Sequence, residues 1–224
     1  VDTDIVVNAN ERYLVAGMGD ALATWYEARV CYNNSAAVTP AGGRPTLASY
    51  AISEICAQAI YDHGEEAAAA VLASQNSEAV EKIVEANTLL SGIGFESGGL
   101  AMAHPLALAY TRIDRVHDTY LHGEIVAIST VAQLFLEQSS DLEKATRFFA
   151  RVGLPVHLGQ LSMSPDDSTE LDILAEVTLA NPSVRHMPVT ISQDLIRASI
   201  LGAHEFGLKI AEEIGDEAYR RLHS

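Results

Sequence analysis

Apolar residues recur along most of the chain at the three- and four-residue steps of an amphipathic helix. The clearest stripe joins six positions on one helix face: Ile196, Ile200, Ala203, Gly207, Ile210 and Ile214. Patterns of this kind predict helices at residues 14–33, 46–73, 76–91, 98–112, 121–138, 141–151, 167–180 and 192–214, with a short one near the C-terminus. We therefore expect an all-α fold, a helical bundle joined by short loops.

Helix-start and helix-stop signals accompany these patterns. Ser140 with Glu143 and Thr190 with Gln193 have the spacing of a capping box, and the segment 164–167 (SPDD) has the form of another helix entrance. Gly153, followed closely by a proline, is typical of a helix end. The segment 111–119 (TRIDRVHDT) is predicted to be a polar turn between two helices.

One stretch does not fit a helical reading. Residues 4–7 (DIVV) predict a short β-strand at the beginning of the chain. A lone strand is unstable because its backbone groups need a neighbouring strand to pair with. The strand is therefore either frayed or the last strand of a sheet that belongs to another part of a larger protein.

Composition excludes several classes of protein. Acidic residues exceed basic ones by 16, which argues against binding to nucleic acid or to anionic lipid, since both need a basic surface. The longest apolar stretch, 67–73, is far shorter than the roughly 20 residues that cross a bilayer. The first residues lack the basic region of a signal peptide, and Cys31 and Cys56 form no disulfide framework. We expect a cytoplasmic protein.

Three residues are candidate metal ligands: Asp20, His104 and His122. Catalytic zinc is commonly held by three protein ligands drawn from histidine and carboxylate, with a fourth position open. A helix–turn–helix can bring the two histidines, 18 residues apart, to one point. Taken singly, Asp20 reads equally well as a helix N-cap, His104 as a core histidine and His122 as a surface residue.

The segments GMGDALATWYEA (17–28), GIGFESGGLAMAH (92–104) and HGEIVAISTVAQLFLE (122–137) resemble the C-terminal helical half of glycerol dehydrogenases. These enzymes belong with the iron-containing alcohol dehydrogenases and dehydroquinate synthases. VGLPVHLGQL (152–161) and HMP (186–188) extend the resemblance over essentially the whole chain. The resemblance implies the C-terminal helical domain of the dehydroquinate synthase-like fold.

The resemblance also implies a metal site. The aspartate of GMGDA is Asp20, the histidine that closes GGLxxxH is His104, and the histidine of HGE is His122. Iron-dependent relatives carry a further histidine where this chain has Thr24, so zinc is favoured, with another divalent ion such as manganese as the alternative. Phe95 resembles the aromatic residue that lines the polyol pocket; ordinary core packing is the other interpretation.

Two departures from the family concern polyol specificity rather than metal binding. Glycerol dehydrogenases often carry a histidine where this chain has Ala107, and the iron group carries one at the position of Leu108. The glycines of 92–99 are not a dinucleotide fingerprint, since no strand precedes them. The resemblance assigns residues 1–10 to a linker from an N-terminal NAD-binding domain that is missing here, and residues 11–224 to a helical catalytic domain.

The expected function is therefore the zinc-binding half of an NAD-dependent glycerol dehydrogenase, which transfers hydride from glycerol to NAD and is inactive without a nucleotide-binding partner domain. A non-catalytic helical assembly module is the alternative, and a zinc hydrolase is a weaker third reading. Glu124, Asp114 or His117 could support the metal ligands. The resemblance further implies a homo-oligomer, an octamer in the family, or pairing with a separate N-terminal chain.

Overall fold

The computed structural model describes all 224 residues as helices joined by loops, without β-strands. The helices are α1 (Thr3–Val6), α2 (Glu11–Asn33), α3 (Leu47–Leu72), α4 (Glu78–Glu85), the π-helical turn η1 (Ala86–Leu90), α5 (Ser91–Gly98), α6 (Ala103–Tyr110), α7 (Asp114–Thr119), α8 (His122–Leu136), α9 (Leu142–Val152), the 3₁₀ turn η2 (Leu158–Leu161), α10 (Ser168–Ala180), the 3₁₀ turn η3 (Pro182–His186), α11 (Gln193–Ile214) and α12 (Glu217–Leu222). The all-α prediction is confirmed. None of the helices combines the length and apolar character needed to cross a membrane.

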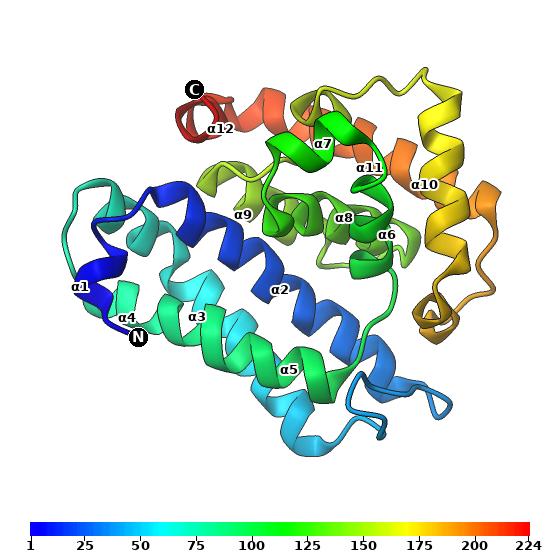
Figure 1. Cartoon of the computed structure of the whole chain (residues 1–224), viewed down its shortest axis with the longest axis horizontal. Coiled ribbons are helices and arrows are strands. Elements are labelled where there is room, and N and C mark those ends of the chain that lie inside the picture. The colour runs from blue at the N-terminus through cyan, green and yellow to red at the C-terminus, as the bar shows by residue number, and fades with distance from the viewer.

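Helix α2 is the central element of the bundle. It crosses the middle of the molecule, with α3 and α5 packed along one side and α8 along the other (Figure 1). Asn10 begins the helix by accepting a hydrogen bond from the backbone N–H of Arg12 at 2.9 Å. Because neighbours cover α2 on several sides, its buried residues are not confined to one stripe, and five of them are alanine or glycine.

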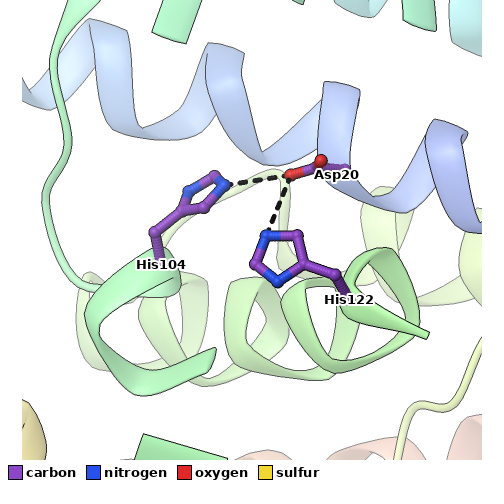
Figure 2. Close-up of side chains that lie close together, drawn as sticks. All are labelled: Asp20, His104 and His122. Carbon is purple, nitrogen blue, oxygen red and sulfur yellow. Dashed lines mark hydrogen bonds and ion pairs between the residues drawn. The ribbon is translucent and has the colours of Figure 1, made fainter. Parts of the chain in front are cut away.

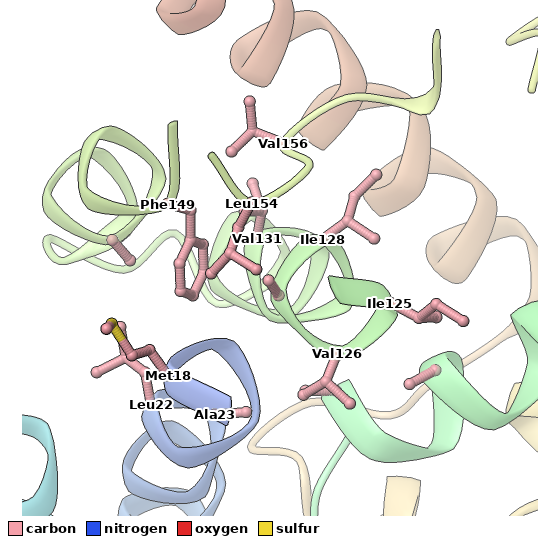
Figure 3. Packing of buried hydrophobic residues seen from close by; sticks show 14 of the residues in the cluster. Met18, Leu22, Ala23, Ile125, Val126, Ile128, Val131, Phe149, Leu154 and Val156 are labelled. Carbon is pink, nitrogen blue, oxygen red and sulfur yellow. The ribbon is translucent and has the colours of Figure 1, made fainter. Parts of the chain in front are cut away.

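The hydrophobic core joins α2 to the second half of the chain. Met18 and Leu22 of α2, Val131 of α8 and Phe149 of α9 meet in one buried cluster, which Leu154 closes from the loop after α9 (Figure 3). Each side chain of this size that becomes fully buried contributes about 2 kcal/mol to folding. The cluster therefore fixes α2 against α8, the two helices that carry Asp20 and His122.

The predicted strand at residues 4–7 is wrong. These residues form the short helix α1, which Asp2 caps by accepting from the N–H of Asp4 at 3.1 Å. No neighbouring strand is present to pair with the backbone, so its N–H groups bond locally, for example Val7 to the carbonyl of Thr3 at 3.0 Å. Asn76 then ties the turn to the loop before α4.

The segment between residues 76 and 112 also differs from the prediction. A single helical rod continues from α4 through the π-helical turn η1 into α5 and ends at Gly98, whereas the next helix, α6, begins only at Ala103. The break follows from Gly99, whose φ of +98° takes the chain out of the helix. A helix predicted to start at residue 98 therefore starts five residues later.

The remaining differences from the prediction concern the segment 111–119 and the caps of α9 and α11. The polar turn predicted at 111–119 contains the short helix α7, because Val116 is buried and Arg115 pairs with Glu170 of α10. The two predicted capping boxes do not form. Helix α9 starts after Asp141 without a side-chain cap, and Ser192 caps α11 in place of Thr190.

Candidate metal centre

Asp20 lies in the interior of α2, which rules out the N-cap role that its sequence context allows. Its Oδ1 lies 3.0 Å from Nε2 of His104 and 3.8 Å from Nε2 of His122. Burial raises the pKa of the Asp20 carboxyl, but the hydrogen bond from His104 and the nearby histidine charges outweigh that effect and lower the pKa. The carboxylate is therefore held in its charged form, the form that binds a cation.

Small residues let α2 and α8 cross closely enough for their ligands to meet. A Cβ atom at Gly123 would lie 1.8 Å from the carbonyl oxygen of Ala16, and one at Gly19 would lie 2.5 Å from the carbonyl oxygen of Gly123. Both glycines are direct sequence neighbours of candidate ligands, Asp20 and His122. The glycines of GMGDA and HGE thus have a packing reason: they set the distance between two helices at the site.

His104 is buried at the start of α6, only 8% exposed. Its ring lies between two carboxylates: Nδ1 donates to Glu27 and Nε2 faces Asp20. Burial alone would lower the pKa of His104, but Glu27 and Asp20 outweigh it and raise the pKa to about 10. The two carboxylates therefore stabilise a positive charge at this ring, carried either by a proton or by a bound cation.

His122 is the first residue of α8 and is 58% exposed. Its ring centre lies 5.8 Å from that of His104, and both rings face Asp20 (Figure 2). One ligand atom from each of the three residues lies within 4.8 Å of the other two. One carboxylate and two imidazoles are a donor set that suits a divalent ion such as zinc.

A cavity of about 310 Å³ opens beside these residues. It is lined by Asp20, Thr24, Ser91, Gly92, Phe95, Glu96, His104 and His122. The ring of Phe95 stands edge-on to that of His104, with centres 5.0 Å apart. Phe95 is the only hydrophobic residue in the lining, so it forms the one aromatic wall of the cavity.

The close approach of α5 places that wall. A Cβ atom at Gly94 would lie 2.5 Å from Cγ2 of Thr24, and one at Gly98 would lie 2.8 Å from Cβ of Ala28. These glycines therefore allow close helix packing. This agrees with the sequence analysis, which found no dinucleotide-binding fingerprint among them. Ala107 and Leu108, the two positions where the resemblance would place a further histidine, lie outside the cavity; Ala107 is buried and Leu108 is exposed.

The residues suggested as supports for the ligands lie elsewhere. Glu124 accepts from Arg12 and from the N–H of Leu121, while Asp114 and His117 are exposed on α7. The residue that does contact a candidate ligand is Glu27, which the sequence analysis did not select. Its only available signal was its position seven residues after Asp20, two helical turns along the same face of α2.

No family model matches the chain. A glycerol dehydrogenase of Escherichia coli is 42% identical over 216 residues, 95% of this chain and 58% of its own length. A glycolaldehyde reductase of Halobacterium salinarum is 38% identical over 95% of the chain and 58% of its own length.

A solved structure shares the fold. It is that of a probable glycerol dehydrogenase from Sinorhizobium meliloti, with 38% identity and a TM-score of 0.88 over 93% of this chain and 59% of the other. The chain thus spans somewhat more than half the length of these relatives, and the matched region is their C-terminal part. By sequence and by fold, the chain is similar to the C-terminal helical part of the glycerol dehydrogenases.

Proposed function

We propose that Asp20, His104 and His122 hold one divalent metal ion, zinc in preference to iron, and that this centre serves an NAD-dependent dehydrogenase of glycerol or a similar small polyol. The observation that carries the proposal is the convergence of one carboxylate and two imidazoles, from three separate helices, on one cavity. Two histidines and a carboxylate with an open fourth position are a usual catalytic zinc set. Thr24 offers no imidazole of the kind that accompanies iron.

When bound, the metal would supply Lewis-acid activation of a substrate hydroxyl. The chain's own residues would do the rest. Asp20 and the two histidines would hold the ion, and Phe95, which lines the same cavity, would shield one side of a bound substrate from water. Ser91 and Glu96 line the same cavity and would accept or donate hydrogen bonds to further hydroxyl groups of a polyol.

The nucleotide would come from outside this chain. The chain spans about 58% of its dehydrogenase relatives, and we propose that NAD binds to the remaining part, which would hold the nicotinamide against the cavity. Under this proposal residues 11–224 are the metal-binding domain and residues 1–10 lead into it. Glycerol is the proposed substrate, with a small hydroxyaldehyde as the closest competitor because one relative is a glycolaldehyde reductase.

We also propose that the chain self-associates, with the octamer that the family resemblance implies as the expected size. Leu47, Ile55 and Leu72 are exposed on α3 and offer apolar surface for such contacts. Sedimentation velocity of the purified chain at several concentrations gives the test. A monomer at every concentration would contradict self-association.

The catalytic proposal is tested by complementation. The zinc-loaded chain is mixed with the separately produced N-terminal part of a glycerol dehydrogenase, and NADH formation from glycerol is followed. We expect activity from the mixture, none from either part alone, and none when His122→Ala replaces the parent chain. A mixture that associates and retains zinc but forms no NADH would instead favour the alternative, a helical assembly module without catalysis.

A further inference from the structure

Glu27 is a fully buried carboxylate that no lysine or arginine neutralises. It is 0% exposed, and its one ion-pair partner is His104. Acidic residues are almost never fully buried unless they are paired, because desolvation of the charge is costly. The burial of Glu27 in α2, two turns from Asp20, therefore needs a structural explanation.

Its contacts lie at the start of α6. Oε1 of Glu27 accepts from the backbone N–H of Ala101 at 2.8 Å and of His104 at 3.2 Å. Oε1 of Gln133, from α8, accepts from the N–H groups of Met102 and Ala103 at 3.0 and 2.9 Å. The first N–H groups of a helix have no partner within it, and Pro105 has none to offer. Two side chains from other helices therefore satisfy this whole terminus.

Glu27 differs from Gln133 in one respect. Its second oxygen, Oε2, accepts from Nδ1 of the His104 ring, whereas the contacts of Gln133 do not include that ring. Three donors thus converge on the two oxygens of Glu27. A carboxylate presents an acceptor on both oxygens, but an amide presents one acceptor and one donor. In either orientation, glutamine at this position would place its NH₂ group against at least one of these N–H donors.

We propose that Glu27 is the positioning residue of the metal centre: it fixes the proton of His104 on Nδ1 and so directs Nε2 toward Asp20 and His122. The proposal rests on the metal site proposed above. Carboxylate partners of this kind fix the tautomer and the ring orientation of metal-binding histidines. Here the same carboxylate also holds the backbone of that histidine, so ring and main chain are set together.

The test compares Glu27→Gln with Gln133→Met. Both variants change a side chain that caps α6, but only the first changes the partner of the His104 ring. We expect the affinity for cobalt(II), measured by competition with a chelator, to fall about 10- to 100-fold in Glu27→Gln and by less than about three-fold in Gln133→Met. Thermal melting of the metal-free proteins shows what the loss of capping alone does. Equal affinity losses in the two variants would overturn the proposal.

A second readout needs no metal. In metal-free protein with ¹⁵N-labelled histidine, we expect a slowly exchanging, strongly downfield Nδ1 proton from His104, retained in Gln133→Met and lost or shifted upfield in Glu27→Gln. An unchanged resonance in Glu27→Gln would show that Glu27 does not hold the ring. If the parent chain binds no cobalt, the proposed metal site fails, while this spectrum still decides the role of Glu27.

Discussion

Two pairs of histidines lie at similar separations in this molecule but in opposite electrostatic surroundings. The rings of His104 and His122 are 5.8 Å apart, and those of His157 and His204 are 6.0 Å apart. The pKa of His104 is raised to about 10, since Glu27 and Asp20 outweigh the effect of burial. Burial lowers the pKa of both His157 and His204. Proximity of two imidazoles therefore does not by itself favour a positive charge; the carboxylates beside His104 do.

The second pair, His157 and His204, contributes to helix packing. Nδ1 of His204 accepts from the backbone N–H of Leu158 at 3.2 Å, which requires the neutral ring. A Cβ atom at Gly207 would lie 1.8 Å from the carbonyl oxygen of Val156, so α11 passes very close to this loop. The pair belongs to the contact between α11 and the chain after α9, and we expect no metal there.

The largest effect is expected from removing the carboxylate that distinguishes the two pairs. Asp20→Asn keeps the size of the side chain but replaces a charged ligand by a neutral one, so zinc affinity should fall at least about 100-fold. Isothermal titration calorimetry gives the measurement, with His204→Gln as the control that should bind zinc as the parent does. Unchanged affinity in Asp20→Asn would remove the carboxylate from the site.

The glycines beside the two pairs provide a matched comparison. Gly123→Ala and Gly207→Ala would each place a Cβ atom 1.8 Å from a backbone oxygen, and each should lower the free energy of unfolding by about 3 kcal/mol, measured by urea denaturation. Only Gly123→Ala should also weaken zinc binding, because it separates His122 from Asp20. Equal zinc affinity in the two variants would mean that the α2–α8 crossing does not set the site.

The pH response should separate the pairs further. Because the folded-state pKa values of His157 and His204 lie below the ordinary value of 6.5, the unfolded chain takes up protons more readily. Their contribution to stability is complete above about pH 6.5 and is lost as the pH falls below it. Asp216 and Glu205 oppose this shift only in part.

Thermal melting between pH 7.5 and pH 5 gives that measurement. The decrease in melting temperature on acidification should be smaller in His204→Gln. The glutamine amide oxygen can still accept from the N–H of Leu158, but the amide does not take up a proton in this pH range. An identical decrease in this variant and the parent would assign the acid sensitivity to other groups.

The smallest effect is expected at the aromatic wall. Phe95→Leu removes the edge-on contact with His104 and should cost about 1 kcal/mol of stability, with zinc affinity changed by less than about three-fold. In the complemented enzyme, the KM for glycerol should rise more than kcat falls. A loss of zinc comparable to that of Asp20→Asn would make Phe95 part of the metal site rather than of the substrate cavity.

The long helices could be predicted from the sequence because their apolar periodicity is strong and local. The predicted ranges 46–73 and 192–214 lie within a residue or so of α3 and α11. Predictions that depend on competition between neighbours were less successful. Ser192 and Thr190 are both good N-cap residues, and the sequence does not say which of them the loop leaves free. Residues 4–7 have the composition of a strand, but a strand needs a partner that this fold does not provide.

The residues of the site also divide into those that sequence motifs predicted and one that they did not. Asp20, His104, His122 and Phe95 stand in long family motifs, and the structure brings them together around one cavity. Glu27 could not be found in this way, because its role depends on the path of the chain from Gly99 to His104, which turns three N–H donors toward one side chain. Glu124, adjacent to the motif histidine, is instead engaged by Arg12. Sequence proximity to a ligand was thus a poorer guide than helical phase.

Elemental analysis of the purified chain shows whether Asp20, His104 and His122 hold a metal ion. The parent should carry about one zinc ion per chain after dialysis against zinc and then buffer. The variant with Asp20→Ala, His104→Ala and His122→Ala together should carry none while keeping its helical circular dichroism. Absence of zinc from the folded parent, or equal zinc in the folded triple variant, would contradict the account.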